Sequence, residues 1–299
     1  MLQNSLKILF VINPISGTKN KINWEPTIRQ YLKGVPHTGE FFLLDGKNDA
    51  ASLRYWIEHV TPDRVVAIGG DGTVSLVAEQ LLNTNIAMGI LPSGSANGMA
   101  KELQIPTDVE GAINVILNGE IKKTDVIRIN NNEICIHLSD IGINAQIIKY
   151  FEEGNIRGKL AYARMLIKAL WKKHLLKVTI NMNGETIKTG AFMVVIANAS
   201  KYGTGAVINP EGNLHDGKFE VVVVRKISLM EFLKLFIHFR RFDPKKVEVF
   251  QTTSATITTI KGAHFQIDGE YLGKTKSVTA VIEAGKLNLL LPPKARESV

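Results

Sequence analysis

Glycine-rich segments with polar side chains occur at three places in the first hundred residues, and each follows a short apolar stretch. They are Asn-Pro-Ile-Ser-Gly at residues 13–17, Gly-Gly-Asp-Gly-Thr at 69–73 and Pro-Ser-Gly-Ser-Ala-Asn-Gly at 92–98. Glycine lets the backbone approach a ligand closely, and the N–H groups that open a following helix attract phosphate. Neighbouring parallel strands end at one edge of a sheet, where ligands bind. The pattern therefore predicts a phosphate-binding cleft.

Each segment taken singly can also be an ordinary turn between a strand and a helix. This alternative is weakest at 69–73, because a carboxylate, Asp71, is a costly choice among three glycines if only a turn is needed. The chain has no G-x-x-x-x-G-K-[ST] segment, which excludes a Walker-type nucleotide site. It also has no G-x-G-x-x-G after a strand, which argues against a dinucleotide oxidoreductase.

Acidic residues in the second half could supply metal binding and base catalysis. Asp216 lies in Asn-Leu-His-Asp-Gly-Lys at 213–218, and Asp268 and Glu270 flank Gly269. Mg²⁺ prefers carboxylate and carbonyl oxygens, and phosphoryl transfer depends on positioning and charge neutralisation. Taken alone, however, Asp-Gly favours a type I′ hairpin turn, with Glu270 exposed on the strand that follows.

The elements that must position these residues change in character near residue 123. Before it, apolar stretches at 7–12, 41–44, 64–68 and 86–91 alternate with helical patterns at 48–60, 73–82 and 108–117. This alternation predicts an α/β domain whose parallel sheet carries helices on both faces. After it, short stretches separated by turn signals predict a mainly antiparallel β-sandwich. The expected strands are 125–129, 133–138, 178–181, 186–197, 219–224, 247–250, 255–260, 264–267 and 278–282.

We therefore expect two domains in the 299-residue chain. The first, residues 1–123, is the α/β domain, and the second, 124–285, is the β-sandwich. The pattern leaves open whether residues 286–299 rejoin the first domain. The single cysteine, Cys135, fits a reducing cytoplasm and a buried core position. The opening residues show no signal peptide, and no apolar run is long enough to cross a bilayer.

Positive charge is concentrated in two segments. The net charge is +8, but residues 157–177 and 225–246 together carry +12, so the rest of the chain carries −4. Within them, 157–174 and 228–241 have bulky apolar residues interleaved with Lys and Arg. Such helices suit an anionic membrane surface, although they can equally be ordinary covers of a domain. No nucleic-acid-binding module accompanies the charge, so we expect no nucleic acid partner.

Five motifs, in order, resemble those of the diacylglycerol kinase and sphingosine kinase family of lipid kinases. Gly-Gly-Asp-Gly-Thr at 69–73 is its signature, which NAD kinases share, and 13–17 and 91–97 resemble its first and third loops. The segments 213–221 and 267–270 are similar to its Asp-Gly-x-(Leu/Phe) and Asp-Gly-Glu motifs. The resemblance covers residues 7 to about 291 and implies an NAD kinase/diacylglycerol kinase-like fold. It also implies that residues 1–123 bind the nucleotide and that residues 124–285 bind lipid and metal.

The resemblance implies a site residue by residue. It makes Glu270 the general base, with Asp268 beside it, and Asp71 a carboxylate that positions Mg²⁺ or activates the hydroxyl. A Mg²⁺ ion would be held by the Asp216 carboxylate and the backbone carbonyls of Asn213 and Lys218. Lys21 can add charge to the phosphates. The residues implied to hold ATP are Asn13, Pro14, Ile15, Ser16, Gly17, Lys19, Gly69, Gly70, Asp71, Gly72, Thr73, Val74, Ser75, Leu76, Ser95 and Asn97.

The expected function is an ATP- and Mg²⁺-dependent phosphorylation of a hydroxyl of diacylglycerol or a related long-chain lipid. The enzyme would be cytoplasmic and would meet its substrate at the membrane surface, and a homo-oligomer is compatible with the sequence. Gln146 stands where sphingosine kinases carry an Asp for the lipid amine, which argues against sphingosine. Two alternatives stay open: an NAD kinase, and a non-catalytic membrane-associated sensor of nucleotide or lipid.

Overall fold

The computed structural model divides the chain into two compact units. It describes residues 5–17, 22–153, 175–202, 206–226, 243 and 245–293. Unit 1 comprises Met1–Thr124 and Gly285–Val299, and unit 2 comprises Asp125–Ala284. The basic segments 157–174 and 228–241, together with Lys19 and Lys21, lie outside the described residues.

Unit 1 is built on a parallel sheet in the order β2-β1-β3-β4, extended beyond β4 by the end of β14. The last pairing joins Asn288 to Ala87 and Leu289 to Met88. Strands β1, β3 and β4 are almost wholly buried, as expected for apolar stretches covered on both faces, whereas the edge strand β2 is largely exposed. Their bounds are β1 (Lys7–Ile12), β2 (Thr38–Leu43), β3 (Arg64–Gly69), β4 (Ala87–Pro92) and β14 (Glu270–Leu291).

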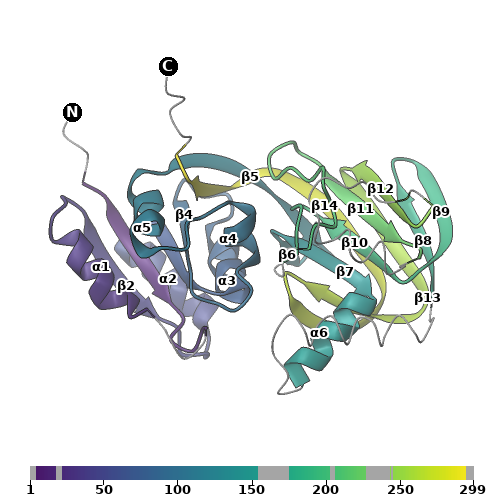
Figure 1. Ribbon diagram of the computed structural model, residues 1–299, viewed down its shortest axis with the longest axis horizontal. Helices are drawn as coiled ribbons and strands as arrows, with labels where there is room; N and C mark the ends of the chain where they lie inside the picture. Colours follow the sequence, from purple (N-terminus) through teal and green to yellow (C-terminus); the bar gives the residue numbers. More distant parts are fainter. Residues whose placement is uncertain are drawn as a thin grey trace. The chain divides into compact units, whose positions relative to one another are not determined.

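Helices cover both faces of this parallel sheet (Figure 1). Residues of α1 and α5 line one shallow pocket and so share a face, whereas α2 contacts α3. The helices of unit 1 are α1 (Trp24–Leu32), α2 (Asp49–Val60), α3 (Asp71–Leu81), α4 (Gly98–Glu102) and α5 (Val109–Asn118). The predicted α/β class of the first half is therefore confirmed.

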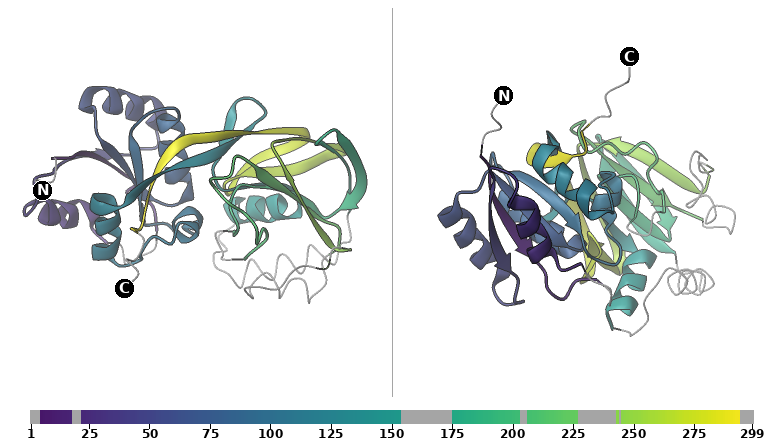
Figure 2. Two further views of the ribbon diagram at one scale, coloured as in Figure 1. Left: turned by 90° about the horizontal axis from the view of Figure 1, so that it is seen from above. Right: turned by 60° about the vertical axis from the view of Figure 1, so that its left-hand side comes forward.

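Unit 2 is mainly antiparallel. Its central path runs β12-β11-β10-β7-β13-β14, while β8 pairs with both β13 and β9, and β5 pairs with β6 and β14. The left-hand view of Figure 2 shows β5 and β14 side by side. The further elements are β5 (Glu120–Ile129), β6 (Glu133–Cys135), β7 (Leu138–Gly142), α6 (Ile143–Glu153), β8 (Leu176–Met182), β9 (Glu185–Ala191), β10 (Met193–Ala197), β11 (Phe219–Val224), β12 (Val247–Thr252) and β13 (Ser254–Ile267).

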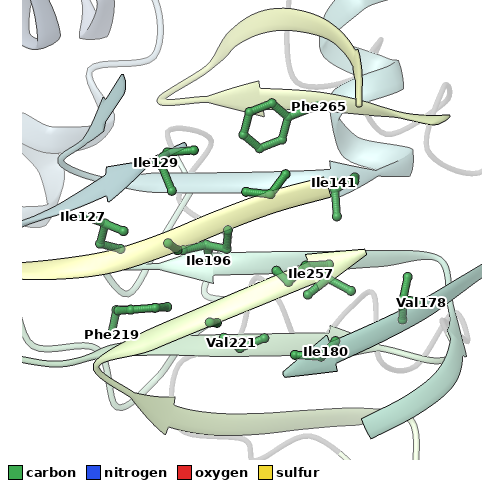
Figure 3. Packing of buried hydrophobic residues seen from close by; sticks show 14 of the residues in the cluster. Ile127, Ile129, Ile141, Val178, Ile180, Ile196, Phe219, Val221, Ile257 and Phe265 are labelled. Atoms are coloured by element: carbon green, nitrogen blue, oxygen red, sulfur yellow. The ribbon is translucent and has the colours of Figure 1, made fainter. Parts of the chain in front are cut away.

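The larger of two apolar clusters in the described part of unit 2 packs between its strands (Figure 3). It combines residues far apart in sequence, such as Ile127, Ile196 and Ile257, all at most 1% exposed. Phe219 and Cys135 are fully buried in the same cluster, so the predicted core position of the cysteine is confirmed. Antiparallel strands around such a core confirm the predicted sandwich-like class.

Several predicted strand boundaries were wrong. The single strand expected at 186–197 is two strands, because the backbone N–H of Phe192 between them bonds to Val224 of β11 instead. The strands expected at 255–260 and 264–267 form one bulged strand, β13. α6 was not expected at all.

Among the described residues, no helix is long and apolar enough to span a membrane.

Candidate active site

The three glycine-rich segments lie at the carboxyl ends of β1, β3 and β4, which are neighbours in the sheet of unit 1. Direct hydrogen bonds join them. The Asn13 amide donates to the Thr73 hydroxyl at 3.2 Å, and the Ser16 hydroxyl donates to that of Ser93 at 3.3 Å. The sequence segments predicted to converge are therefore brought together into one cluster of loops.

The three loops approach one another closely at glycines. A Cβ atom added to Gly94 would lie 2.4 Å from the Cα atom of Gly70, and one added to Gly17 would lie 2.3 Å from the Ser93 carbonyl oxygen. Gly17 also has a φ of +84°, which L side chains rarely adopt. Glycine is thus required here by close backbone approach, which an ordinary strand-to-helix turn does not demand.

The N-terminus of α3 opens into this loop cluster. Gly70 is its N-cap in an extended conformation, and Asp71 stands in its first turn. The first N–H groups of a helix have no partner within the helix and carry a partial positive charge, which favours phosphate. Thr73 and Val74 are buried under the loop, whereas Ser75 and Leu76 are half-buried further along α3.

The carboxylate of Asp71 links α3 to α4. One of its oxygens accepts the backbone N–H of Met99 at 3.2 Å, and its side chain remains partly exposed. The Asp71 side chain is thus held by the loop cluster while keeping access to solvent. It can therefore position a cation or an attacking hydroxyl without a burial cost.

The other residues implied for ATP fall into two groups. Pro14, Ile15 and Ser95 are exposed at the loop tips, Ile15 by 85%. Asn97 instead turns inward: its side-chain oxygen accepts the Gly94 N–H at 2.8 Å, and its amide donates to the Gly94 carbonyl at 2.9 Å. Asn97 shapes its own loop.

The Asp-Gly-Glu segment of unit 2 forms the hairpin between β13 and β14. Asp268 and Gly269 both have positive φ, 50° and 93°, and Ile267 pairs with Glu270 across the turn. These values match the type I′ turn predicted from the sequence. Glu270 is exposed at the first position of β14.

Asp268, in contrast, is only 8% exposed. Its carboxylate accepts the backbone N–H groups of Ile136, His137 and Leu138 at 2.9–3.1 Å and the Cys135 thiol at 3.3 Å. Burial raises the pKa of Asp268, while these backbone N–H donors act to lower it. The family resemblance implied only that Asp268 stands beside the base, Glu270. In the structure, the Asp268 side chain fastens the hairpin to the loop before β7.

The segment 213–218 of unit 2 carries the proposed metal ligands. The exposed Asp216 carboxylate accepts the Lys218 N–H at 3.1 Å and the Gln251 amide at 3.3 Å. The Asp125 carboxylate accepts the Gly217 N–H at 2.6 Å. Burial, and to a smaller extent the nearby charges of Asp216 and Glu211, raise the pKa of Glu220.

The donor set around this turn fits a divalent cation. Asp216 supplies one exposed carboxylate, Asp125 bonds to the same turn, and Glu220 is close enough to Asp216 to interact electrostatically. Such oxygen ligands, completed by water, are what Mg²⁺ prefers. In the described part of the chain, no three His, Cys, Asp or Glu side chains are grouped to hold a metal, so the backbone carbonyls of Asn213 and Lys218 would be needed.

A buried carboxylate that the sequence analysis missed lies on β7. Asp140 is fully buried, and it accepts hydrogen bonds from the Gln266 amide at 2.6 Å, the Asn144 amide at 2.5 Å and the Ala145 N–H at 2.9 Å. Burial raises its pKa to about 6. Gln266 also accepts the Gly269 N–H at 2.8 Å, so Asp140 is connected to the hairpin. The sequence signal that could have revealed Asp140 is an acidic residue inside an otherwise apolar strand.

Comparisons with known proteins identify the family. Residues 7–129 match the diacylglycerol kinase catalytic domain, and residues 139–291 match the YegS C-terminal NAD kinase beta sandwich-like domain. This chain belongs to the diacylglycerol kinase family, a family of lipid kinases. The two matched regions correspond to the α/β and the β-sandwich parts of the chain, and together they contain all five motifs.

Individual relatives agree with this family. A diacylglycerol kinase of Staphylococcus aureus is 24% identical over 272 residues, covering 88% of this chain and 86% of that protein. A Synechocystis protein without an assigned activity is 29% identical over 274 residues, and the match covers 87% of this chain and 59% of that longer protein.

Solved structures share the fold. A putative diacylglycerol kinase of Bacillus anthracis has a TM-score of 0.80 at 20% identity, covering 96% of this chain and 97% of that one. An NAD kinase of Archaeoglobus fulgidus in complex with ATP has a TM-score of 0.53 at 11% identity, covering 97% and 95%. These likenesses support the predicted NAD kinase/diacylglycerol kinase-like architecture.

Proposed function

We propose that this protein transfers the γ-phosphate of ATP to a hydroxyl group of diacylglycerol or a related long-chain lipid. The observation that carries the proposal is the loop cluster of unit 1, in which Gly70 and Gly94 touch beside the N-terminus of α3. Backbone N–H groups bind the phosphates of a nucleoside triphosphate, and glycines let the backbone come close to them. The A. fulgidus NAD kinase was solved with ATP, which supports a nucleotide role for this fold.

Phosphoryl transfer needs positioning and charge neutralisation more than covalent work by the protein. The loops 13–17 and 69–76, with Ser95, would hold the phosphates, and Asp71 would orient the reacting groups. The lipid hydroxyl oxygen forms a bond to the γ-phosphorus as the bond to the β-phosphate oxygen breaks, releasing ADP. Glu270, an exposed carboxylate on a fastened turn, would accept the hydroxyl proton.

Magnesium is the second part of the proposal. Asn213, Asp216 and Lys218 would hold one ion through a carboxylate and two carbonyls. A bound Mg²⁺ supplies positive charge and rigidity to an otherwise acidic turn. Asp125 and Glu220, which approach the same turn, would strengthen this attraction.

Two alternatives are less well supported. An NAD kinase shares the signature at 69–73 and the general fold, but the catalytic-domain match and the S. aureus relative both favour the lipid kinase branch. A non-catalytic sensor would not require Asp71, Asp216 and Glu270 together, and all three are present.

The decisive experiment is transfer of labelled phosphate from ATP to detergent-dispersed diacylglycerol, sphingosine and NAD in turn. We expect product with diacylglycerol and a loss of about 100-fold or more in Asp71→Asn, since a preorganised charge is removed. Glu79→Gln is the matched control, because Glu79 is an exposed carboxylate further along α3. Preferential labelling of NAD, or full activity in Asp71→Asn, would contradict the proposal.

A further inference from the structure

A chain of hydrogen bonds connects a buried acid to the turn that carries Glu270. Asp140 on β7 stands directly opposite Gln266 on β13, and its carboxylate accepts the Gln266 amide at 2.6 Å. The oxygen of the same Gln266 side chain accepts the Gly269 N–H at 2.8 Å. Gly269 directly precedes Glu270, so this chain of bonds ends on the backbone beside the proposed base.

Asp140 sets the direction in which the Gln266 amide points. An ionised carboxylate accepts hydrogen bonds and donates none. The pKa of Asp140 is raised to about 6 by burial, so at pH 8 the group is ionised and draws the Gln266 NH₂ group toward itself. The Gln266 oxygen must then face the Gly269 N–H. Gln266 is only 1% exposed, so water has little access to either end of its amide.

Asp140 is itself held in one orientation. One carboxylate oxygen accepts the Ala145 N–H at 2.9 Å, and the other accepts the Asn144 amide at 2.5 Å and the Tyr202 hydroxyl at 3.4 Å. A buried acid in an apolar strand is costly unless hydrogen bonds offset its desolvation. Here those bonds also fix the orientation of the carboxylate, and the carboxylate fixes that of Gln266.

The turn between β13 and β14 is fastened by two side chains. The Asp268 carboxylate binds the N–H groups of residues 136–138 and so holds the first residue of the turn. Gln266 holds the second residue, Gly269. Among the described residues, nothing lies within 4 Å of a Cβ atom added to Gly269, so packing does not hold the backbone there. The Gln266 oxygen therefore fixes the backbone directly before Glu270.

We propose that Asp140 and Gln266 are positioning residues for phosphoryl transfer, which set the orientation in which the turn presents Glu270 to the lipid hydroxyl. The inference rests on the proposed function, in which Glu270 is the base. A general base must lie within hydrogen-bond reach of the proton that it accepts, and a misplacement of about 1 Å can cost about 100-fold in rate. A network that only stabilised the fold would not have to end on the residue beside the base.

The first test exchanges the two side chains. Asp140→Asn places an amide NH₂ group against that of Gln266, which must turn over and oppose its own NH₂ group to the Gly269 N–H. Asp140→Asn/Gln266→Glu restores the chain of bonds. In this exchanged pair, the amide at position 140 donates to the carboxylate at position 266, which again accepts the Gly269 N–H.

The readout is the detergent-dispersed kinase assay at pH 8. We expect Asp140→Asn to lower kcat by on the order of 10- to 100-fold with the KM for ATP unchanged, and the exchanged pair to recover most of the loss. Ile180→Val is the matched control, because it thins the buried core of unit 2 on β8 and should lower the melting temperature at wild-type kcat. Wild-type kcat in Asp140→Asn, or no recovery in the exchanged pair, would overturn the proposal.

The second test follows the Gly269 N–H directly, by amide hydrogen exchange of protein labelled with ¹⁵N-glycine. We expect this N–H to be protected in wild type and in the exchanged pair, and to lose protection in Asp140→Asn. Gln266→Met, which removes the acceptor and keeps Asp140, should lose protection and kcat in the same way. Gly184, in the exposed turn between β8 and β9, should exchange alike in all four proteins. Equal exchange of Gly269 in all four would refute the positioning role.

The two tests separate this inference from the kinase proposal. An inactive wild type would reject the kinase proposal, and hydrogen exchange would still decide whether Asp140 controls the turn. Activity in wild type without recovery in the exchanged pair would reject the positioning role and leave the kinase standing.

Discussion

Asp268 and Glu270 are separated by only Gly269, yet their different surroundings give them different roles. Asp268 is buried under three backbone N–H groups, whereas Glu270 is exposed. A carboxylate that satisfies buried donors stabilises the fold, and an exposed one is available to a substrate. Asp268 therefore holds the turn in place, whereas Glu270 lies at the surface of the hairpin.

This division predicts opposite effects of two conservative substitutions. Asp268→Asn should lower stability by roughly 1–3 kcal/mol, because its amide group opposes buried N–H donors. Glu270→Gln should change stability by less than about 0.5 kcal/mol and reduce turnover by roughly 10²- to 10⁴-fold. Thermal unfolding and the detergent-dispersed kinase assay measure the two effects. Unaltered melting in Asp268→Asn would show that the turn does not depend on it.

The buried Asp140 predicts a pH dependence of stability. Its pKa is raised from 3.8 to about 6 by burial, so the folded state binds this proton more tightly than the unfolded state. Stability from this group is therefore present below pH 4 and is lost as the pH rises through about 6. Between pH 5 and 7 the contribution should fall by roughly 1 kcal/mol.

The measurement is urea unfolding of wild type and Asp140→Asn at pH 5 and 7. The difference in unfolding free energy between the two proteins should favour wild type more strongly at pH 5. Asp45→Asn, an exposed carboxylate of unit 1, is the control and should show no such change. A pH-independent difference for Asp140→Asn would contradict the raised pKa.

At the scale of elements, the loop cluster depends on two glycines that leave room for each other. We expect Gly94→Ala to weaken ATP binding by on the order of tenfold or more, because its Cβ would meet the Gly70 backbone at 2.4 Å. Backbone atoms cannot yield as a flexible side chain can, so the loops must separate. Gly34→Ala is the control, since nothing lies within 4 Å of its added Cβ. Calorimetric titration with ATP distinguishes the two, and equal affinities would contradict the requirement.

The turn at 213–218, with Asp216 in it and Asp125 and Glu220 beside it, predicts stabilisation by magnesium. Mg²⁺ should raise the melting temperature of wild type by mass action, and this shift should disappear in Asp216→Ala. Melting curves with and without Mg²⁺ measure it, with Asp45→Ala as a control of equal charge change. Equal shifts in all three proteins would mean that Asp216 is not a ligand.

At this scale, the features that the sequence predicted correctly depend on neighbouring residues. The features that it missed depend on contacts between residues far apart in the chain. The loops at 13–17 and 69–73 were predictable because glycines, polar residues and apolar strands are read within a few positions. The connection of Asp140 to Gln266 spans 126 residues and is set by strand pairing. The merged strand β13 was missed because its bulge interrupts the alternation of buried and exposed residues.

At the scale of the molecule, unit 1 is completed by residues from the end of the chain. The end of β14 pairs with β4, Asn83 donates to the Lys286 carbonyl at 2.9 Å, and Leu287 and Leu289 are at most 1% exposed. Each buried leucine contributes about 2 kcal/mol. The stability of the unit that carries the three glycine-rich loops thus depends on residues that lie far from them in the sequence.

Truncation tests this dependence. A chain ending at Ala284 should lose ATP binding although every loop residue is intact, because β4 becomes an open edge. A chain ending at Pro293, which keeps all of β14, should bind like wild type. Circular dichroism and ATP titration of both chains provide the measurement. Wild-type affinity in the shorter chain would show that unit 1 is stable without its last strand.

The same pairing has a consequence for the order of events during synthesis. β4 ends at Pro92, but its partner residues, Asn288 and Leu289, leave the ribosome about 200 residues later. At 5–20 residues per second, this leaves about 10–40 s in which the nascent first unit presents an unpaired apolar edge. Nearly all of that interval is spent on the synthesis of unit 2, whose contiguous residues end at Ala284, just before the partner residues of β4. Unit 1 is therefore the first to begin folding and the last to be completed, and until then its open strand is exposed to chaperones and to neighbouring nascent chains.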